Sequence, residues 1–237
     1  MSIGKEIINL QPMLSYNFRD ISYLENALTH SSYSNEQKYR GIAVQSNERL
    51  EFLGDAILQA LISKYLFENY KNHSEGVLTR MRQYLVCEKT LSKIAAEIDI
   101  GEYLNVGKGE ETNGCRTRPK VLADALEAIF AAVYLDSFAV DPAIHEQVIL
   151  SLFKKELDGL SSSFNDDYKT MLQQLVEKDG SSSLEYEVVS TEGPDHNKHF
   201  IVVARINNNV VGRGEAKSKK EAEMQAAKVA LELFGLV

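Results

Sequence analysis

The sequence predicts a protein of two domains, an all-α domain followed by a small α+β domain with the order helix, strand, strand, strand, helix. Apolar residues recur at helical spacing from Leu10 to about Leu157, and convincing two-residue alternation is missing there. Further on, strand-like runs stand between two helical segments. Between the two patterns lies a small, polar stretch at 158–163, whose composition is typical of a flexible joint.

The change of pattern places the domain boundaries. With 237 residues the chain exceeds what one average domain needs. We therefore expect the first domain at 1–158, a flexible linker at 159–165 and the second domain at 166–237.

Composition excludes several classes of protein. The 44% of hydrophobic residues suffices for a core, and the longest uninterrupted apolar stretch, Ala128–Leu135, is far too short to cross a bilayer. We therefore expect no membrane association and no export. Cys87 and Cys115 lack the pairing of a metal site, which favours reduced thiols in the cytoplasm. The net charge of -8 argues against attraction of the whole protein to nucleic acid, so any such binding requires local basic patches or metal ions.

Helix breaks in the first domain are expected near Gly41, near Gly76, across 101–119 and at Asp141-Pro142, where an Asp before a Pro suits a helix start.

The second domain has clear turn and cap signals. Asn207-Asn208-Asn209 suits a tight hairpin, because Asn tolerates the left-handed conformation. Ser218 is a good N-cap, with Glu221 three residues later. The expected elements are a helix at 168–179, strands at 184–190, 198–206 and 210–216, and a helix at 218–234.

Two predicted helices carry carboxylates among apolar residues. On a helix over 47–58, Glu48, Glu51 and Asp55 fall within an arc of about 60° while apolar residues occupy most of the remaining circumference. In 122–135 the only charged residues are Asp124 and Glu127, three apart and so on one face. Burying a carboxylate among apolar neighbours costs several kcal/mol or more, so both helices require a compensating cation.

The compensating cation has two candidate sources. One is a network of salt bridges from arginines; the candidates are Arg49, Arg80, Arg82, Arg116 and Arg118. The other is a metal ion, which acids gathered from two helices favour. Hard oxygen ligands without clustered Cys or His suit Mg²⁺ rather than zinc. Magnesium held by carboxylates is typical of phosphoryl chemistry. The spacing alone leaves open which phosphate is attacked, since all-helical nucleotide pyrophosphohydrolases also place acids three apart.

Four spaced segments resemble the ribonuclease III family, and the resemblance covers nearly the entire chain. They are NERLEFLGDAIL at 47–58, ALTHSSYSNE at 27–36, KGEETNGCRTRPKVLADALEAIFAAVYLD at 108–136, and the whole C-terminal module. The resemblance implies a ribonuclease III endonuclease fold and a magnesium-dependent endoribonuclease. Such an enzyme cuts double-stranded RNA in ribosomal, messenger and transfer RNA precursors and leaves short 3' overhangs with 5'-phosphate and 3'-hydroxyl ends.

The resemblance also assigns roles to acids. It implies that Mg²⁺, with Mn²⁺ as a substitute, and the attacking water are held by Glu51, Asp55, Asp124 and Glu127. Of these, Asp55 and Glu127 would be the most critical to the chemistry. Glu48 and Glu75 would assist substrate or metal binding. Cys115 departs from the family, which more often has a small residue there, and this bears only on the local loop.

Family members are homodimers, and Phe52 offers a reason. A large aromatic side chain beside the acids is either ordinary core or an anchor that fills a pocket of the partner. The resemblance favours the anchor, with two metal sites related by a twofold axis across one duplex.

The C-terminal module resembles a double-stranded-RNA-binding domain. Arg213, Lys217, Lys219 and Lys220 cluster at the start of the last helix. They form either a phosphate clamp that uses the positive helix N-terminus or a solvated run of charge. By resemblance, further RNA contacts come from Lys169, Gln173, Gln174, Pro194, Asp195 and His196.

Three functions therefore compete: the endonuclease, a non-catalytic RNA-binding protein of the same fold, and a nucleotide pyrophosphohydrolase. The retained acids disfavour the second and the RNA-binding module disfavours the third.

Overall fold

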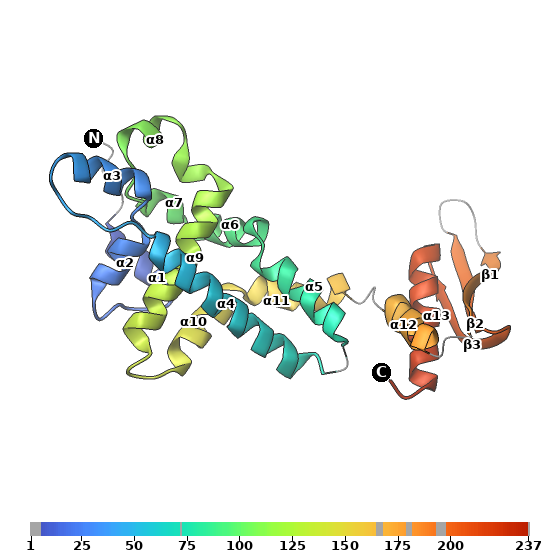
Figure 1. Ribbon diagram of the computed structural model, residues 1–237. Helices are drawn as coiled ribbons and strands as arrows, with labels where there is room; N and C mark the ends of the chain where they lie inside the picture. Colours follow the sequence, from blue (N-terminus) through green and yellow to red (C-terminus); the bar gives the residue numbers. More distant parts are fainter. Residues whose placement is uncertain (1–5, 72, 165–167, 179–181, 193–197, 237) are drawn as a thin grey trace. The chain divides into compact units, whose positions relative to one another are not determined.

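The computed structural model describes residues 6–71, 73–164, 168–178, 182–192 and 198–236 (Figure 1). The chain divides into two compact units, Met1–Asn69 with Leu78–Asp158, and Tyr70–Val77 with Gly159–Val237.

The described elements up to residue 164 are helices, as expected for the first domain. They are η1 (Ile7–Leu10), α1 (Gln11–Leu14), α2 (Ile21–Ala27), α3 (Ser31–Tyr39), α4 (Glu48–Asn69), α5 (Glu75–Val86), α6 (Glu88–Glu97), α7 (Ile100–Tyr103), α8 (Lys108–Thr112), η2 (Cys115–Thr117), α9 (Pro119–Ser137), α10 (Ala143–Leu152) and α11 (Lys154–Phe164). No helix in these described ranges is both long and apolar enough to span a bilayer.

Helix α9 is the centre of the helical unit and packs against α2, α4, α6 and α10 (Figure 1). Its residues 128–133 are fully buried, as a helix apolar on nearly all sides requires. The Phe130 ring packs on Phe153 with ring centroids 6.1 Å apart. At the C-terminal end of α9 the buried Asp136 accepts hydrogen bonds from the Tyr16 hydroxyl and the Arg19 and Asp20 backbone N–H groups. These three donors satisfy a carboxylate that would otherwise be costly to bury.

Gly54 allows α4 to cross α9 at very short range. A Cβ atom at this position would lie 1.9 Å from the backbone oxygen of Glu127. No side chain fits in that space, so only glycine permits the crossing. The close approach brings the acidic stripe of α4 against the two acids of α9.

The expected helix breaks are found in the structure. Gly41 follows α3 with φ +78°, the 101–119 stretch is divided into short helices, and the Asp141 carboxylate accepts from the Ala143 backbone N–H at the start of α10. Helix α4 ends at Asn69 and α5 begins at Glu75, so the break predicted near Gly76 lies directly before it.

The expected linker differs from the structure. Residues 159–164 belong to the helix α11, whereas the small and polar composition predicts a flexible joint. The physical reason is that Leu157 and Leu160, three apart on one helix face, are both buried. Their burial outweighs the weak helix propensity of the small residues beside them.

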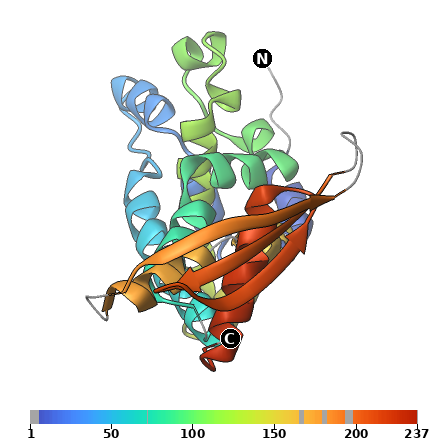
Figure 2. The ribbon, with the colours of Figure 1, turned by 90° about the vertical axis from the view of Figure 1, so that its right-hand side faces the viewer.

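The second domain has the predicted element order. It consists of α12 (Tyr168–Lys178), β1 (Leu184–Glu192), β2 (His199–Ile206), β3 (Asn209–Ala216) and α13 (Lys219–Leu233). The strands form an antiparallel sheet in the order β1-β2-β3. Figure 2 shows the sheet in front of α13, which covers its far face. The two turn residues Asn207 and Asn208 have φ values of 48° and 66°, which confirms the left-handed hairpin.

Small residues let α13 lie close to the sheet. Cβ atoms at Gly212 and Gly214 would come within 2.0 Å and 2.1 Å of the backbone oxygens of Ala226 and Ala222. The rest of this core is formed by buried side chains of α12, β2 and α13.

Candidate metal centre

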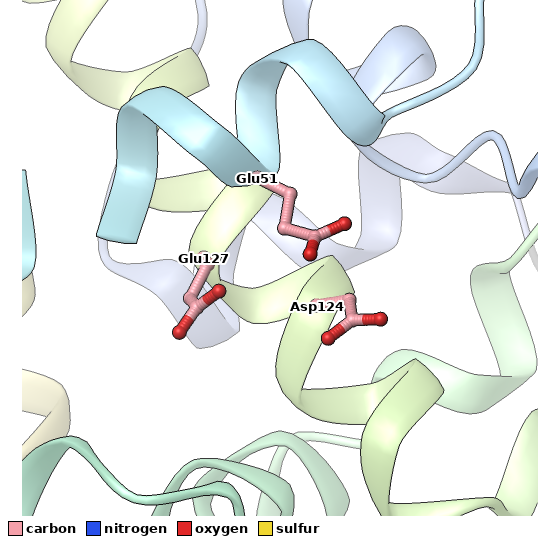
Figure 3. Close-up of side chains that lie close together, drawn as sticks. All are labelled: Glu51, Asp124 and Glu127. Carbon is pink, nitrogen blue, oxygen red and sulfur yellow. The ribbon is translucent and has the colours of Figure 1, made fainter. Parts of the chain in front are cut away.

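Three carboxylates meet where α4 crosses α9. Glu51 comes from α4 and Asp124 and Glu127 from α9, and one oxygen atom of each lies within 4.8 Å of the others (Figure 3). All three side chains are half-buried. The spacing follows from the fold, because Glu51 lies one turn before Gly54 and the two acids of α9 are three residues apart. The predicted meeting of acids from two helices is therefore found for these three residues.

The electrostatics of the cluster favour a cation. Burial, and then repulsion from Asp55, Asp124 and Glu51, raise the pKa of Glu127 to about 8. Burial and the charge of Asp124 also raise the pKa of Glu51. Negative groups held this close repel one another, and a divalent ion relieves the repulsion. Hard oxygen donors with access to solvent fit Mg²⁺, which keeps several water ligands when bound by a few carboxylates.

Asp55 has a different environment from the three clustered acids. Both of its carboxylate oxygens accept hydrogen bonds from Gln59 Nε2, at 2.9 and 3.0 Å. Its charge contributes to the raised pKa of Glu127, so the two groups are electrostatic neighbours. Metal binding by Asp55 stays a prediction.

The two assisting acids are exposed. Glu48 begins α4 and accepts a hydrogen bond from Ser46 Oγ, and Glu75 begins α5. Their roles stay predictions.

Three of the five candidate arginines have partners outside the acidic cluster. Arg116 pairs with Glu111 at 2.8 Å, Arg118 pairs with Glu110 at 2.6 Å, and Arg82 donates to Ser63 Oγ. A lysine that the sequence reasoning missed approaches the cluster instead.

Lys120 is that lysine, and its Nζ lies 3.1 Å from the carboxylate oxygens of Asp124. The signal in the sequence is the spacing of four residues, which places the two side chains on the same face of one helix.

Phe52 is an exposed aromatic residue. Its relative exposure is 80%, so the alternative of an ordinary core residue is wrong for the single chain. An anchor in a partner's pocket stays the prediction.

The proposed phosphate clamp lies at the start of α13. Ser218 accepts a hydrogen bond from the Glu221 backbone N–H, which confirms the predicted N-cap. The side chains of Lys217, Lys219 and Lys220 are exposed beside it.

The other predicted RNA contacts have mixed environments. Lys169 Nζ lies 2.5 Å from a Glu223 carboxylate oxygen and 4.7 Å from the centroid of the Tyr186 ring, so this lysine has partners within the domain. Gln173 and Gln174 are exposed on α12. Pro194, Asp195 and His196 lie outside the described residues.

Comparison with known proteins agrees with both halves of this description. A family model described as Ribonuclease-III-like matches residues 20–152, which is more than half of the chain. The chain belongs to the ribonuclease III family. A second model, described as Double-stranded RNA binding motif, matches residues 168–233.

Several ribonuclease III proteins resemble the chain over nearly its full length. Ribonuclease 3 of Clostridium tetani is 43% identical over 96% of this chain and 94% of that protein. Ribonuclease 3 of Natranaerobius thermophilus is 46% identical over 97% of this chain and 98% of that protein. Among solved structures, the nuclease domain of ribonuclease III from Campylobacter jejuni is 37% identical, with a TM-score of 0.57 over 63% of this chain and 97% of that chain.

Proposed function

We propose that this protein is an endoribonuclease that hydrolyses phosphodiester bonds in double-stranded RNA. The observation that carries the proposal is the meeting of Glu51, Asp124 and Glu127 at one point, in a ribonuclease III chain that also matches the double-stranded RNA binding motif. The substrates we expect are precursors of ribosomal, messenger and transfer RNA, in the cytoplasm. We keep the division into a catalytic domain at 1–158, a connecting segment at 159–165 and an RNA-binding domain at 166–237.

The metal centre would be held by Glu51, Asp124 and Glu127, with Asp55 beside Glu127. Bound Mg²⁺, or Mn²⁺ in its place, supplies charge neutralisation at the phosphate and a more acidic water. Because the pKa of Glu127 is raised to about 8, this carboxyl would have to give up a proton near neutral pH in order to hold a cation. Gln59 orients the Asp55 carboxylate, which we assign to positioning the attacking water.

The chemical step is a hydrolysis at phosphorus. The water oxygen bonds to phosphorus and gives up one proton to solvent, the bond from phosphorus to the 3' oxygen breaks, and the leaving 3' oxygen takes up one proton from solvent. The products are a 5'-phosphate and a 3'-hydroxyl.

We further propose a homodimer in which Phe52 anchors one protomer to its partner. Its 80% exposure supports this, since an aromatic ring in water is costly and a partner's pocket would remove that cost. The nuclease domain of the Campylobacter jejuni ribonuclease III has a structurally flexible region that is involved in dimer formation. Two sites related by a twofold axis would cut the two strands of one duplex and leave short 3' overhangs.

The test is cleavage of a long RNA duplex, a single-stranded RNA and a DNA duplex, each with Mg²⁺, Mn²⁺ or EDTA. We expect cutting of the RNA duplex alone, with either metal. Glu127→Gln keeps the side-chain volume but removes a charge, so we expect cleavage to fall by orders of magnitude while duplex binding survives.

Glu68→Gln is the matched control, because Glu68 is exposed on α4, about 25 Å along the helix from Glu51. It should cut like the unaltered protein. Near-normal cleavage by Glu127→Gln would refute the site assignment. Duplex binding by the unaltered protein without cutting in any metal would favour the non-catalytic alternative.

A further inference from the structure

Lys120 brings a positive charge to the mouth of the acidic cluster. Its Nζ lies 3.1 Å from both carboxylate oxygens of Asp124. The Lys120 side chain is 71% exposed, while that of Asp124 is 25% exposed. The charge of Lys120 also lowers the pKa values of Glu51 and Glu127, so all three acids sense the same ammonium group.

The stability of α9 does not explain a lysine at this position. Lys120 is the second residue of the helix, where the positive end of the helix dipole disfavours a cation. The pair with Asp124 also has the less favourable orientation, because a helical pair of this spacing is stronger when the acid comes first. The acidic partners of Lys120 are first Asp124, then Glu51 of the same cluster, and last Glu88 at the start of α6.

We propose that Lys120 is a built-in counter-ion that competes with the divalent metal ion for Asp124 and thereby raises the metal concentration needed to fill the centre. The inference rests on the proposed function, because it takes the acidic cluster as the metal centre. An ammonium group and a metal ion cannot use the same carboxylate lone pairs at the same time. The lysine stem is flexible and exposed, so the ammonium group moves into solvent when the ion enters.

Competition has a measurable consequence for metal affinity. With Lys120 present, the incoming ion must displace the ammonium group from Asp124 and then tolerate a positive charge close by. Without it, we expect metal binding to be roughly three- to tenfold tighter, given a solvent-screened pair and two like charges at the edge of the protein. If Lys120 only holds Asp124 in place, replacing it should weaken metal binding or leave it unchanged, because Asp124 would be less well positioned.

The experiment measures Mn²⁺ binding to the metal-free full-length protein without RNA, by electron paramagnetic resonance of the free ion at one fixed pH. Lys120→Met removes the charge and keeps a stem of similar length, and Lys120→Arg keeps the charge. Lys154→Met is the matched control. Lys154 pairs with Asp158 four residues later at 3.0 Å, with a similar exposure of 75%, but outside the acidic cluster.

We expect Lys120→Met to bind Mn²⁺ three- to tenfold more tightly, and Lys120→Arg and Lys154→Met to bind it like the unaltered protein. The Mg²⁺ concentration for half-maximal cleavage should fall by the same factor in Lys120→Met. Circular dichroism verifies that each variant is folded. Unchanged or weaker Mn²⁺ binding by folded Lys120→Met would overturn the inference and leave the metal centre intact. Absence of Mn²⁺ binding by the unaltered protein would instead refute the metal centre, and the inference with it.

Discussion

Replacing Glu127 by Gln should stabilise the metal-free protein at alkaline pH, although it destroys the proposed active site. Glu127 is pressed against other acids, and its pKa is raised from 4.5 to about 8. Below pH 4.5 the carboxyl is protonated in both the folded and the unfolded chain, so it adds no penalty. As the pH rises from 4.5 towards 8, the unfolded chain loses this proton while the folded chain keeps it. The free energy of unfolding therefore falls over this range and reaches its lower level above pH 8.

The magnitude follows from the same two pKa values. Each tenfold change in proton affinity corresponds to about 1.4 kcal/mol, so a change from 4.5 to about 8 has an upper limit of about 5 kcal/mol. The carboxyl keeps some contact with solvent and shares the repulsion with its neighbours, which reduces the effect. We expect Glu127→Gln to be more stable than the unaltered protein by about 2 kcal/mol at pH 8.5 and by nearly zero at pH 4.5.

The assay is urea unfolding followed by the helical circular dichroism signal, in EDTA, at pH values from 4.5 to 8.5. Groups outside the acidic cluster titrate equally in both proteins, so the difference between the two curves reports on Glu127 and its acidic neighbours. Glu68→Gln serves as the control and should show no trend with pH. Adding Mg²⁺ should stabilise the unaltered protein more than Glu127→Gln and so reduce the difference in their free energies of unfolding. The reasoning would be refuted if, in EDTA, the difference in free energy of unfolding between Glu127→Gln and the unaltered protein stayed constant or narrowed as the pH rises.

Three further predictions concern the crossing of α4 and α9, the dimer, and the phosphate clamp at the start of α13. Gly54→Ala should destabilise the protein by roughly 2–4 kcal/mol in urea unfolding, because its Cβ would lie 1.9 Å from the Glu127 backbone oxygen; a loss below about 1 kcal/mol would contradict the required close approach. Phe52→Ala should shift the protein towards monomer in sedimentation velocity with its helical signal unchanged, and an unaltered dimer would exclude Phe52 as the anchor. Lys219→Ala with Lys220→Ala should weaken duplex binding and reduce the slope of log affinity against log salt by about two units, whereas an unchanged slope would exclude the clamp.

The sequence predicts the two acidic helices well, because the constraint behind them is local. A carboxylate on an otherwise apolar helix needs a partner, and this requirement can be stated before any fold is known. The hairpin at Asn207 and Asn208 and the cap at Ser218 are likewise predictable, since backbone geometry selects these residue types.

The arrangement within the site depends on contacts between distant segments. Gly54 can be recognised as a small residue, but nothing local indicates that the backbone of Glu127 lies against it. Gln59, which donates to both oxygens of Asp55, is a local partner, because it lies four residues later on the same helix and helical spacing alone would pair the two. Lys120 is a second case of the same kind, because its partner Asp124 also lies only four residues away. The expectation of arginine partners for the acids left this lysine out.

In the proposed function, the charges of the chain give a reason for catalysis and binding to use separate parts. A protein of net charge -8 must bring a polyanion to a cluster of carboxylates, and this cluster alone repels phosphate. Exposed lysines at the start of α13 offer local attraction without changing the charge of the catalytic unit. A divalent ion would then reverse the sign of the potential only at the point of cleavage. In this arrangement metal binding controls cutting more strongly than it controls duplex binding, and a lysine that competes for the metal ion adjusts cutting without weakening the attachment to RNA.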